Sequence, residues 1–355
     1  DCRQDGSPLG EKGGRAGYLF NATIAGIEEA DAVLLIGTNP RQEAPVLNTR
    51  IRKIWRNRVV PIGLIGERTD LTYAYHYLGS GPETLAELAG GAASFAETLM
   101  KAERPLIILG SGAVARPDGA AILNLAVKAA LKAGAVKQDW NGFSVLNTAA
   151  ARVGGLDIGA LPGPQGMNTD QILNGCGSGG IDVVYLLGAD EIDMRRLGKA
   201  FVIYQGTHGD EGAHRADIIL PGSAYTEKFG TYVNVEGRPQ TARRAVFPPG
   251  DAREDWAIIR AFSEVIGRPL PFNNLHELHQ RLYKDVPHLE HIDVVRPADA
   301  SMLQDLAAAE GKWNAAAFIN PVKDFYLTNP IARSSTTMAL LSKLRGELTS
   351  LQAAE

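Results

Sequence analysis

Short apolar runs alternate along this chain with longer segments in which apolar residues recur every three or four positions. The runs at residues 32–37, 59–65 and 105–109 predict buried strands, and the spacing across residues 43–58 and 120–133 predicts helices. Strands that alternate with helices are typical of parallel sheets with helices on both faces. We therefore expect an α/β fold.

The same alternation resumes after a stretch with little periodicity. Residues 154–180 are rich in Gly and Pro and predict a long loop with a short helix near residues 169–173. Later strands are expected at residues 182–187, 200–204 and 217–220, and other helices at residues 23–30, 85–100, 253–266, 275–283, 298–310 and 336–352. We expect the strand at residues 217–220 to be central and buried, and Glu227 to lie on a short helix just beyond it. These boundaries predict a first α/β lobe over residues 1–153, a connection over 154–180, a second lobe over 181–270 and a carboxyl-terminal helical extension over 271–355.

Composition limits the kinds of partner. A chain of 355 residues, 45% hydrophobic and 21% charged, is long enough to bury a large core. Its net charge of −4, without any block of Lys and Arg, argues against nucleic acid as a partner. No apolar run reaches the roughly 18 residues that a membrane-spanning helix needs. We expect no direct membrane insertion, so any membrane attachment must come through partner proteins.

Cysteine usage argues against a metal cluster in this chain. Cys2 and Cys176 are its only cysteines, whereas an iron–sulfur cluster takes about four. The chain also begins at Asp1, without Met, and carries no signal peptide. We therefore expect that an amino-terminal portion of the natural protein is missing.

A glycine-rich turn follows the strand predicted at residues 105–109. Gly110, Gly112 and Ala115 satisfy the Gly-x-Gly-x-x-Ala pattern of dinucleotide-binding turns. Glycines there let a backbone approach a pyrophosphate at the start of a helix. However, Arg-Pro-Asp-Gly at residues 116–119 interrupts that helix, and no acidic residue ends a second strand at the right distance. The pattern alone is therefore weak support for an NAD site.

Polar residues close the strand predicted at residues 32–37, at the edge where doubly wound sheets bind ligands. Asn39 or Arg41 could contact a nucleotide there. Local chemistry favours a simple turn into a helix, because Asn39 is a good helix cap and Pro40 a good first helical residue.

Several possible metal ligands precede the strand predicted at residues 217–220. They are His208, Asp210, Glu211, His214 and Asp217. A zinc site needs about three or four converging ligands, and this spacing matches no known ligand pattern. His214 and Asp217 could instead cap a turn or pair with Arg215. We therefore expect no metal here.

Basic side chains surround the helix predicted at residues 43–58. Residues 50–58 carry them, while Ile51, Ile54 and Trp55 would face inward. A solvated helix face is the default interpretation of such a tract, and contact with a neighbouring subunit is the sharper one.

Longer motifs carry a resemblance to a known family. Asp-Ile-Ile-Leu-Pro-Gly at residues 217–222, Glu-Lys-Phe-Gly-Thr at 227–231 and Asn-Val-Glu-Gly-Arg at 234–238 follow one another in an order typical of molybdopterin oxidoreductases. Together with Asp-Cys-Arg-Gln-Asp-Gly at residues 1–6 and the closing residues 325–333, these motifs are most similar to those of one branch of the family. This branch is the large iron–sulfur subunit (G type) of NADH–quinone oxidoreductase, respiratory complex I, and the match covers almost the whole chain.

The resemblance implies a degenerate molybdopterin-oxidoreductase fold with two doubly wound nucleotide-binding-like lobes. Active formate dehydrogenases carry a reactive Cys or selenocysteine after a Cys-Ala-Arg tract, and residues 1–7 resemble that tract with the reactive residue gone. Cys2 would match an upstream cysteine, and Asp5 is the one candidate ligand for molybdenum. Since the complex I branch is understood to carry no molybdenum, we expect none.

We also expect no catalytic residue and no metal ligand. In formate dehydrogenases and nitrate reductases, the region that corresponds to residues 37–41 meets a guanosine diphosphate arm of the pterin cofactor. Candidates for a vestigial cleft are Asn39, Arg41, Gly110, Gly112, His208 and Glu227.

The resemblance also implies a function without local catalysis. The chain would belong to proton-pumping NADH:quinone oxidoreductase and would be a cofactor-free scaffold for the iron–sulfur domain that precedes it. The missing portion would hold 2Fe-2S and 4Fe-4S clusters. Expected partners are other peripheral-arm subunits, including the flavin-bearing NADH-binding subunit. The expected location is peripheral, on the cytoplasmic side of a bacterial inner membrane or the matrix side of the mitochondrial one.

Two alternatives from other classes remain open. The chain could be a fragment of an active molybdopterin enzyme similar to formate dehydrogenase, which stoichiometric molybdenum would reveal. It could also be an NAD-dependent dehydrogenase, which rests on residues 110–115 alone.

Overall fold

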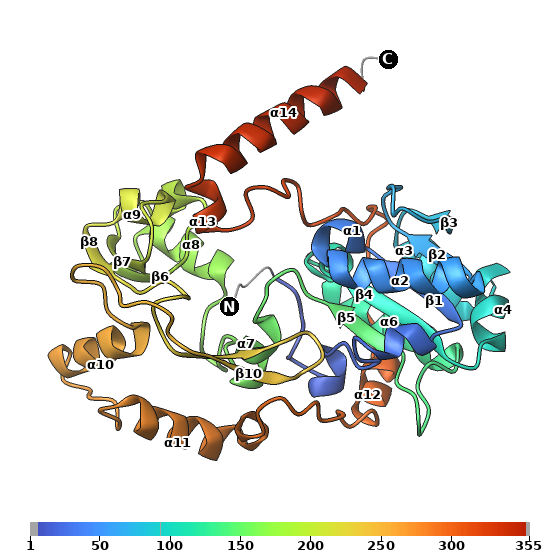
Figure 1. The fold of residues 1–355 in the computed structure, drawn as a ribbon, viewed down its shortest axis with the longest axis horizontal. Coiled ribbons are helices and arrows are strands. Elements are labelled where there is room, and N and C mark those ends of the chain that lie inside the picture. Colours follow the sequence, from blue (N-terminus) through green and yellow to red (C-terminus); the bar gives the residue numbers. More distant parts are fainter. Residues whose placement is uncertain (1–5, 93, 353–355) are drawn as a thin grey trace. The chain divides into compact units, whose positions relative to one another are not determined.

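The computed structural model describes residues 6–92 and 94–352, and the chain divides into two compact units. Unit 1 is built from Asp1–Leu161, Val233–Gln240 and His291–Lys323, and unit 2 from Pro162–Tyr232, Thr241–Glu290 and Asp324–Glu355. Each unit contains one parallel sheet (Figure 1). The α/β fold expected from the sequence is confirmed.

Unit 1 is organised around a five-stranded parallel sheet in the order β3-β2-β1-β4-β5. Its strands are β1 (Ala32–Ile36), β2 (Ile62–Ile65), β3 (His76–Gly79), β4 (Pro105–Gly110) and β5 (Phe143–Leu146). The central strand β1 pairs with both β2 and β4, so that Val33 lies between Ile62 and Leu106. Every residue of β1, β2 and β4 is buried, which explains why these strands are continuous apolar runs.

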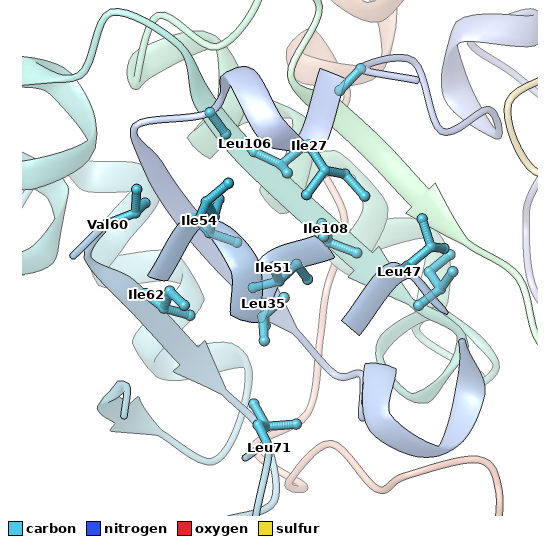
Figure 2. Close-up of a cluster of buried hydrophobic side chains, with 14 of the residues drawn as sticks. Ile27, Leu35, Leu47, Ile51, Ile54, Val60, Ile62, Leu71, Leu106 and Ile108 are labelled. Atoms are coloured by element: carbon cyan, nitrogen blue, oxygen red, sulfur yellow. The ribbon is translucent and has the colours of Figure 1, made fainter. Parts of the chain in front are cut away.

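Helices and short turns surround this sheet. They are η1 (Arg15–Gly17), η2 (Gly26–Glu29), α1 (Pro40–Glu43), α2 (Pro45–Arg58), α3 (Pro82–Gly90), α4 (Ser94–Lys101), α5 (Ser111–Val114), α6 (Gly119–Lys132), α7 (Arg152–Asp157) and α12 (Met302–Ala308). Helix α2 places Leu47, Ile51 and Ile54 on one buried face. Figure 2 shows this face against Leu35 and Ile62 of the sheet. Burying each such side chain contributes about 1.5–3 kcal/mol.

The basic tract on α2 is largely bound by unit 1 itself. Arg50 and Lys53 each pair with Glu28 at 2.5 Å, and Arg58 donates to the carbonyl oxygens of Glu28 and Ala30. Two backbone carbonyls and one carboxylate at η2 therefore orient much of this positive charge.

Unit 2 contains a three-stranded parallel sheet in the order β6-β7-β8. Its strands are β6 (Val183–Leu187), β7 (Phe201–Gly206) and β8 (Ile218–Pro221), and its helices and turns are α8 (Thr169–Ser178), η3 (Met194–Leu197), α9 (Glu211–Arg215), α10 (Asp255–Val265), α11 (Leu275–Asp285), η4 (Pro287–Glu290), α13 (Pro330–Arg333) and α14 (Thr336–Gln352). Val184, Val202 and Tyr204 pack with Leu173 and Cys176 of α8 in one core. Over the described ranges, no helix is both long and apolar enough to span a bilayer.

A hairpin carries one of the recognised motifs. It consists of β9 (Gly230–Val233) and β10 (Pro239–Ala242), and the Asn-Val-Glu-Gly-Arg motif forms its turn within unit 1. Glu236 accepts the backbone N–H of Ile24 at 2.8 Å, and Val235 accepts that of Phe20 at 2.9 Å. Gly237 has a φ of 81°, which favours glycine. The motif therefore serves to attach this turn to the start of unit 1.

The strand predicted at residues 217–220 is present, but we expected it to be central and buried, which is wrong. It is the edge strand β8, and Ile218 and Ile219 are 45% and 53% exposed. An apolar run does not distinguish an edge strand from a central one, because neighbours in space decide its burial. The short helix expected at Glu227 is also absent, since residues 225–228 form a turn and a bend.

Several element boundaries also differ from the prediction. The helix expected at residues 85–100 is divided into α3 and α4, and Gly91, with a φ of 82°, caps the carboxyl end of α3. The expected loop at residues 154–180 contains the end of α7 and all of α8. Helix α8 begins with a capping box between Asn168 and Gln171, a strong local signal that compensates for its weak apolar periodicity.

Candidate functional site

The strand order of unit 1 reverses at the carboxyl ends of β1 and β4. From β1 the chain adds β2 and β3 on one side, and β4 and β5 follow on the other (Figure 1). Ligands of open parallel sheets bind outside the carboxyl ends of the strands at such a switch point. Four residues predicted from the sequence lie at or just after the ends of these two strands, namely Asn39, Arg41, Gly110 and Gly112.

Close contact between the turns after β1 and β4 explains why Gly37 and Gly110 are glycines. A Cβ on Gly110 would lie 2.5 Å from Thr38 Cβ, and a Cβ on Gly37 would lie 2.6 Å from the backbone nitrogen of Ala113. Gly37 also has a φ of 56°. The turns after β1 and β4 thus need these glycines in order to pack against each other.

A buried carboxyl group lies in the turn after β1. Glu43 accepts from the Thr38 hydroxyl at 3.0 Å and from the Asn39 backbone N–H at 2.5 Å. Burial raises the pKa of Glu43 to about 7, although these two hydrogen bonds act in the opposite direction. Asn39 Oδ1 and Glu43 Oε2 are both buried, and neither has a hydrogen-bond partner among the described residues. Sequence reasoning missed Glu43, because nothing in the local pattern shows that its carboxyl group is buried.

The other polar residues at this edge bind their own chain. Asn39 is the N-cap residue of α1, as predicted, but its side chain donates to Thr69 Oγ1 at 3.0 Å and makes no capping hydrogen bond. Glu43 binds the Asn39 backbone N–H instead, while Pro40 does begin the helix as predicted. Arg41 pairs with Asp70 at 2.5 Å.

His208 and Glu227 belong to unit 2, where they follow β7 and β8. His208 Nδ1 lies 2.8 Å from Thr207 Oγ1. Glu227 accepts the backbone N–H of Ala224 at 2.9 Å and so closes the turn after β8. Each of these side chains is held by a near neighbour in sequence.

Three of the remaining possible metal ligands before β8 have structural partners, and the fourth, Glu211, is an exposed residue at the start of α9. Asp210 binds Arg333 Nε at 2.7 Å, His214 Nδ1 lies 2.9 Å from the Asp210 carbonyl oxygen, and Asp217 accepts the Val202 backbone N–H at 2.8 Å. Within residues 6–92 and 94–352, no group of three or more His, Cys, Asp or Glu side chains could hold a metal ion. Two further candidates, Cys2 and Asp5, lie outside the described residues.

A segment distant in sequence lies across the carboxyl edge of unit 1. Residues 311–320, which we call the covering segment, meet residues just after three different strands. The Phe318 backbone N–H donates to Ser80 O after β3 at 2.9 Å, and the Asn320 N–H donates to the Glu67 carboxylate after β2 at 2.8 Å. After β4, a Cβ on Gly112 would overlap the Ile319 carbonyl oxygen. Nothing local in the sequence could have indicated these contacts.

A parallel sheet with a glycine turn at its switch point defines a doubly wound domain with a nucleotide-binding-like topology. Residues 2–265 match the family model of molybdopterin oxidoreductase, which covers more than half of the chain. The chain belongs to the molybdopterin oxidoreductase family. Residues 294–340 match a second family model, which describes the carboxyl-terminal region of the G-type subunit of NADH-ubiquinone oxidoreductase.

Large subunits of NADH-ubiquinone oxidoreductase are among the most similar relatives. The chain is 43% identical over 333 residues to the NADH-ubiquinone oxidoreductase 75 kDa subunit of Reclinomonas americana. The aligned part covers 93% of this chain and 47% of the relative. It is 44% identical over 333 residues to the 78 kDa subunit of Candida albicans, covering 92% of this chain and 44% of the relative. The chain thus spans about half the length of the curated relatives it matches.

One solved structure supports the fold. The acetylene hydratase of Pelobacter acetylenicus aligns with this chain with a TM-score of 0.50. The alignment covers 94% of this chain and 61% of the hydratase chain. At 11% sequence identity, this likeness concerns the fold alone.

The nucleotide arm of a molybdopterin cofactor does not fit the switch point of unit 1. The space in front of Gly112 is taken by the Ile319 carbonyl oxygen, and Gly37 and Gly110 are in contact with the opposite turn. We therefore assign no chemical step to such a cofactor at this edge.

Proposed function

We propose that this chain is the carboxyl-terminal part of the large iron–sulfur subunit of a proton-pumping NADH:quinone oxidoreductase, and that this part is a cofactor-free scaffold. The similarity to 75 and 78 kDa subunits over more than nine-tenths of the chain supports the assignment. The match of residues 294–340 to the G-type carboxyl-terminal model adds to it.

One observation carries the scaffold role. At the switch point, where a doubly wound domain would bind a ligand, the polar and glycine residues of unit 1 contact other residues of the same chain. Asn39 binds Thr69, Arg41 pairs with Asp70, and Gly112 meets the covering segment. These contacts stabilise the fold, and they engage the Asn39 side-chain amide and the Arg41 guanidinium within the chain itself.

The proposal places electron transfer elsewhere in the subunit. Clusters of the 2Fe-2S and 4Fe-4S type would lie in the portion that precedes this chain, and no molybdenum would be bound here. Partners would be other peripheral-arm subunits, including the flavin-bearing NADH-binding subunit. The subunit would be peripheral, on the cytoplasmic side of a bacterial inner membrane or the matrix side of a mitochondrial one.

Single substitutions in the full-length subunit test the scaffold role. Arg41, His208 and His214 are changed to Ala one at a time, and NADH oxidation with quinone is normalised to flavin content. We expect turnover per assembled complex near that of the wild type, because a weakened scaffold lowers abundance and not rate. A large loss of normalised turnover in any variant, with assembly intact, would mean that the site is catalytic.

Metal content tests the alternative of an active molybdopterin enzyme. We expect no stoichiometric molybdenum in the purified full-length subunit, and Asp5→Ala should leave the metal content unchanged. Stoichiometric molybdenum that is lost in Asp5→Ala would favour the alternative.

A further inference from the structure

We propose that the covering segment is an internal replacement for a nucleotide ligand at the switch point of unit 1. The proposal rests on the proposed function, because it explains how a fold of this family is completed without a cofactor. It assigns a role to residues 311–320 that goes beyond support of a neighbouring domain.

The first step concerns position. Residues 318–320 contact Ser80, Glu67 and Gly112, which follow β3, β2 and β4 respectively. These contacts extend across the carboxyl edge on both sides of β1. The segment therefore lies where a nucleotide would lie in a ligand-binding sheet of this topology.

The second step concerns the glycine pattern. In a dinucleotide turn, the second glycine leaves room for a pyrophosphate oxygen. Here Gly112 leaves room for the Ile319 carbonyl oxygen, since a Cβ on Gly112 would overlap it. An oxygen atom of the chain thus takes the place of an oxygen atom of a ligand.

The third step concerns the residues that interrupt the helix after the glycine pattern. Arg116 and Asp118 form a bidentate pair at 2.5 and 3.0 Å, with side chains only 12% and 9% exposed. The Arg116 guanidinium also donates to the Ala316 carbonyl at 2.9 Å, and Asp118 accepts the Asn314 N–H at 2.8 Å. The departure from the dinucleotide pattern at residues 116–119 is therefore the binding site for the covering segment.

Phe318 is the apolar anchor of the same segment. Its side chain is fully buried, and the Arg116 guanidinium lies 5.5 Å from its ring centroid. The covering segment falls within residues 294–340, the part that matches the G-type carboxyl-terminal model. The part of the chain beyond the molybdopterin oxidoreductase match therefore supplies the group that fills the switch point.

Hydrogen exchange on the whole chain tests the proposal. In Phe318→Ala, amides in residues 37–43 and 110–116 should exchange at least about tenfold faster, while β6, β7 and β8 stay as in the wild type. The matched control is Phe325→Ala, which removes a ring that is 42% exposed and belongs to unit 2. Faster exchange confined to residues 311–320 would overturn the proposal.

Gly112→Ala serves as a second variant in case Phe318→Ala does not fold. The new methyl group should displace the Ile319 carbonyl and speed exchange over residues 311–320 together with residues 37–43 and 110–116, whereas Gly90→Ala, which meets nothing within 4 Å, should not. An unchanged Gly112→Ala profile would contradict the contact.

Guanosine diphosphate is the probe for the nucleotide itself. The wild-type chain should show no saturable binding of it, and saturable binding with protection of residues 110–116 would overturn the proposal. Neither readout involves turnover of the respiratory complex, so this proposal and the proposed function can fail separately.

Discussion

Glu43 shows how a single residue can be important for the fold without belonging to any recognisable motif. Its carboxyl group completes the turn after β1 and is held by Thr38 and by the Asn39 backbone. Its pKa of about 7 means that the folded chain binds a proton more tightly than the unfolded chain, where the ordinary value is 4.5. The free energy of unfolding should therefore fall as pH rises from about 4.5 to 7.

We predict that Glu43→Gln removes this pH dependence. The amide oxygen can still accept both hydrogen bonds, but it carries no charge. At pH 8 the variant should be more stable than the wild type by on the order of 2 kcal/mol, and near pH 4.5 the two should be about equal. Urea unfolding at the two pH values measures this difference, with the exposed Glu97→Gln as control. An equal difference at both pH values would contradict the buried carboxyl.

At the scale of the element, the two sheets show that an apolar run has different meanings in a central and an edge strand. Val202 in β7 is fully buried between two strands, whereas Ile219 in β8 is 53% exposed at the edge. Both positions look alike in sequence. A charged side chain introduced into the central strand should therefore destabilise the fold more than one introduced into the edge strand.

We predict that Val202→Asp destabilises unit 2 by several kcal/mol, because it buries an unpaired charge. Ile219→Asp should change the free energy of unfolding by less than about 1 kcal/mol, since solvent can reach the new carboxylate. Thermal unfolding of the two variants provides the comparison. Equal destabilisation would show that β8 is covered in the folded chain.

The fold was predictable from sequence where local pattern and environment agree. Residues 32–37 and 105–109 are apolar because both faces of their strands are buried, and they correspond to β1 and β4. Strand β3 was missed, because its half-exposed residues carry no periodic signal. At the site, the Gly-x-Gly-x-x-Ala pattern identified Gly110 and Gly112. The covering segment escaped prediction, because its contacts join residues about 200 positions apart.

At the scale of the whole molecule, the final residues return to unit 2 through one arginine. Arg333 binds Asp210 at 2.7 Å and Glu191 at 3.2 Å, and its side chain is 23% exposed. These pairs connect α13 to the loops after β6 and β7. Helix α14 follows α13 directly.

We predict that Arg333→Ala releases the end of the chain without unfolding the rest. Proteolysis within residues 324–352 should become faster, and the melting temperature of the remaining domain should stay nearly unchanged. Arg281→Ala is the control, because Arg281 makes only an exposed pair within α11. A global loss of stability in Arg333→Ala would instead make this arginine part of the core of unit 2.

The division of the chain into interleaved segments has a consequence for synthesis on the ribosome. The last segment of unit 1 ends at residue 323, which is about 160 residues after its first segment ends at Leu161. At translation rates of roughly 5–20 residues per second, this is a delay of roughly 10–30 s. Throughout that interval the switch point of the nascent sheet is without its own covering residues. An edge left open for that time is a place where the nascent chain can aggregate.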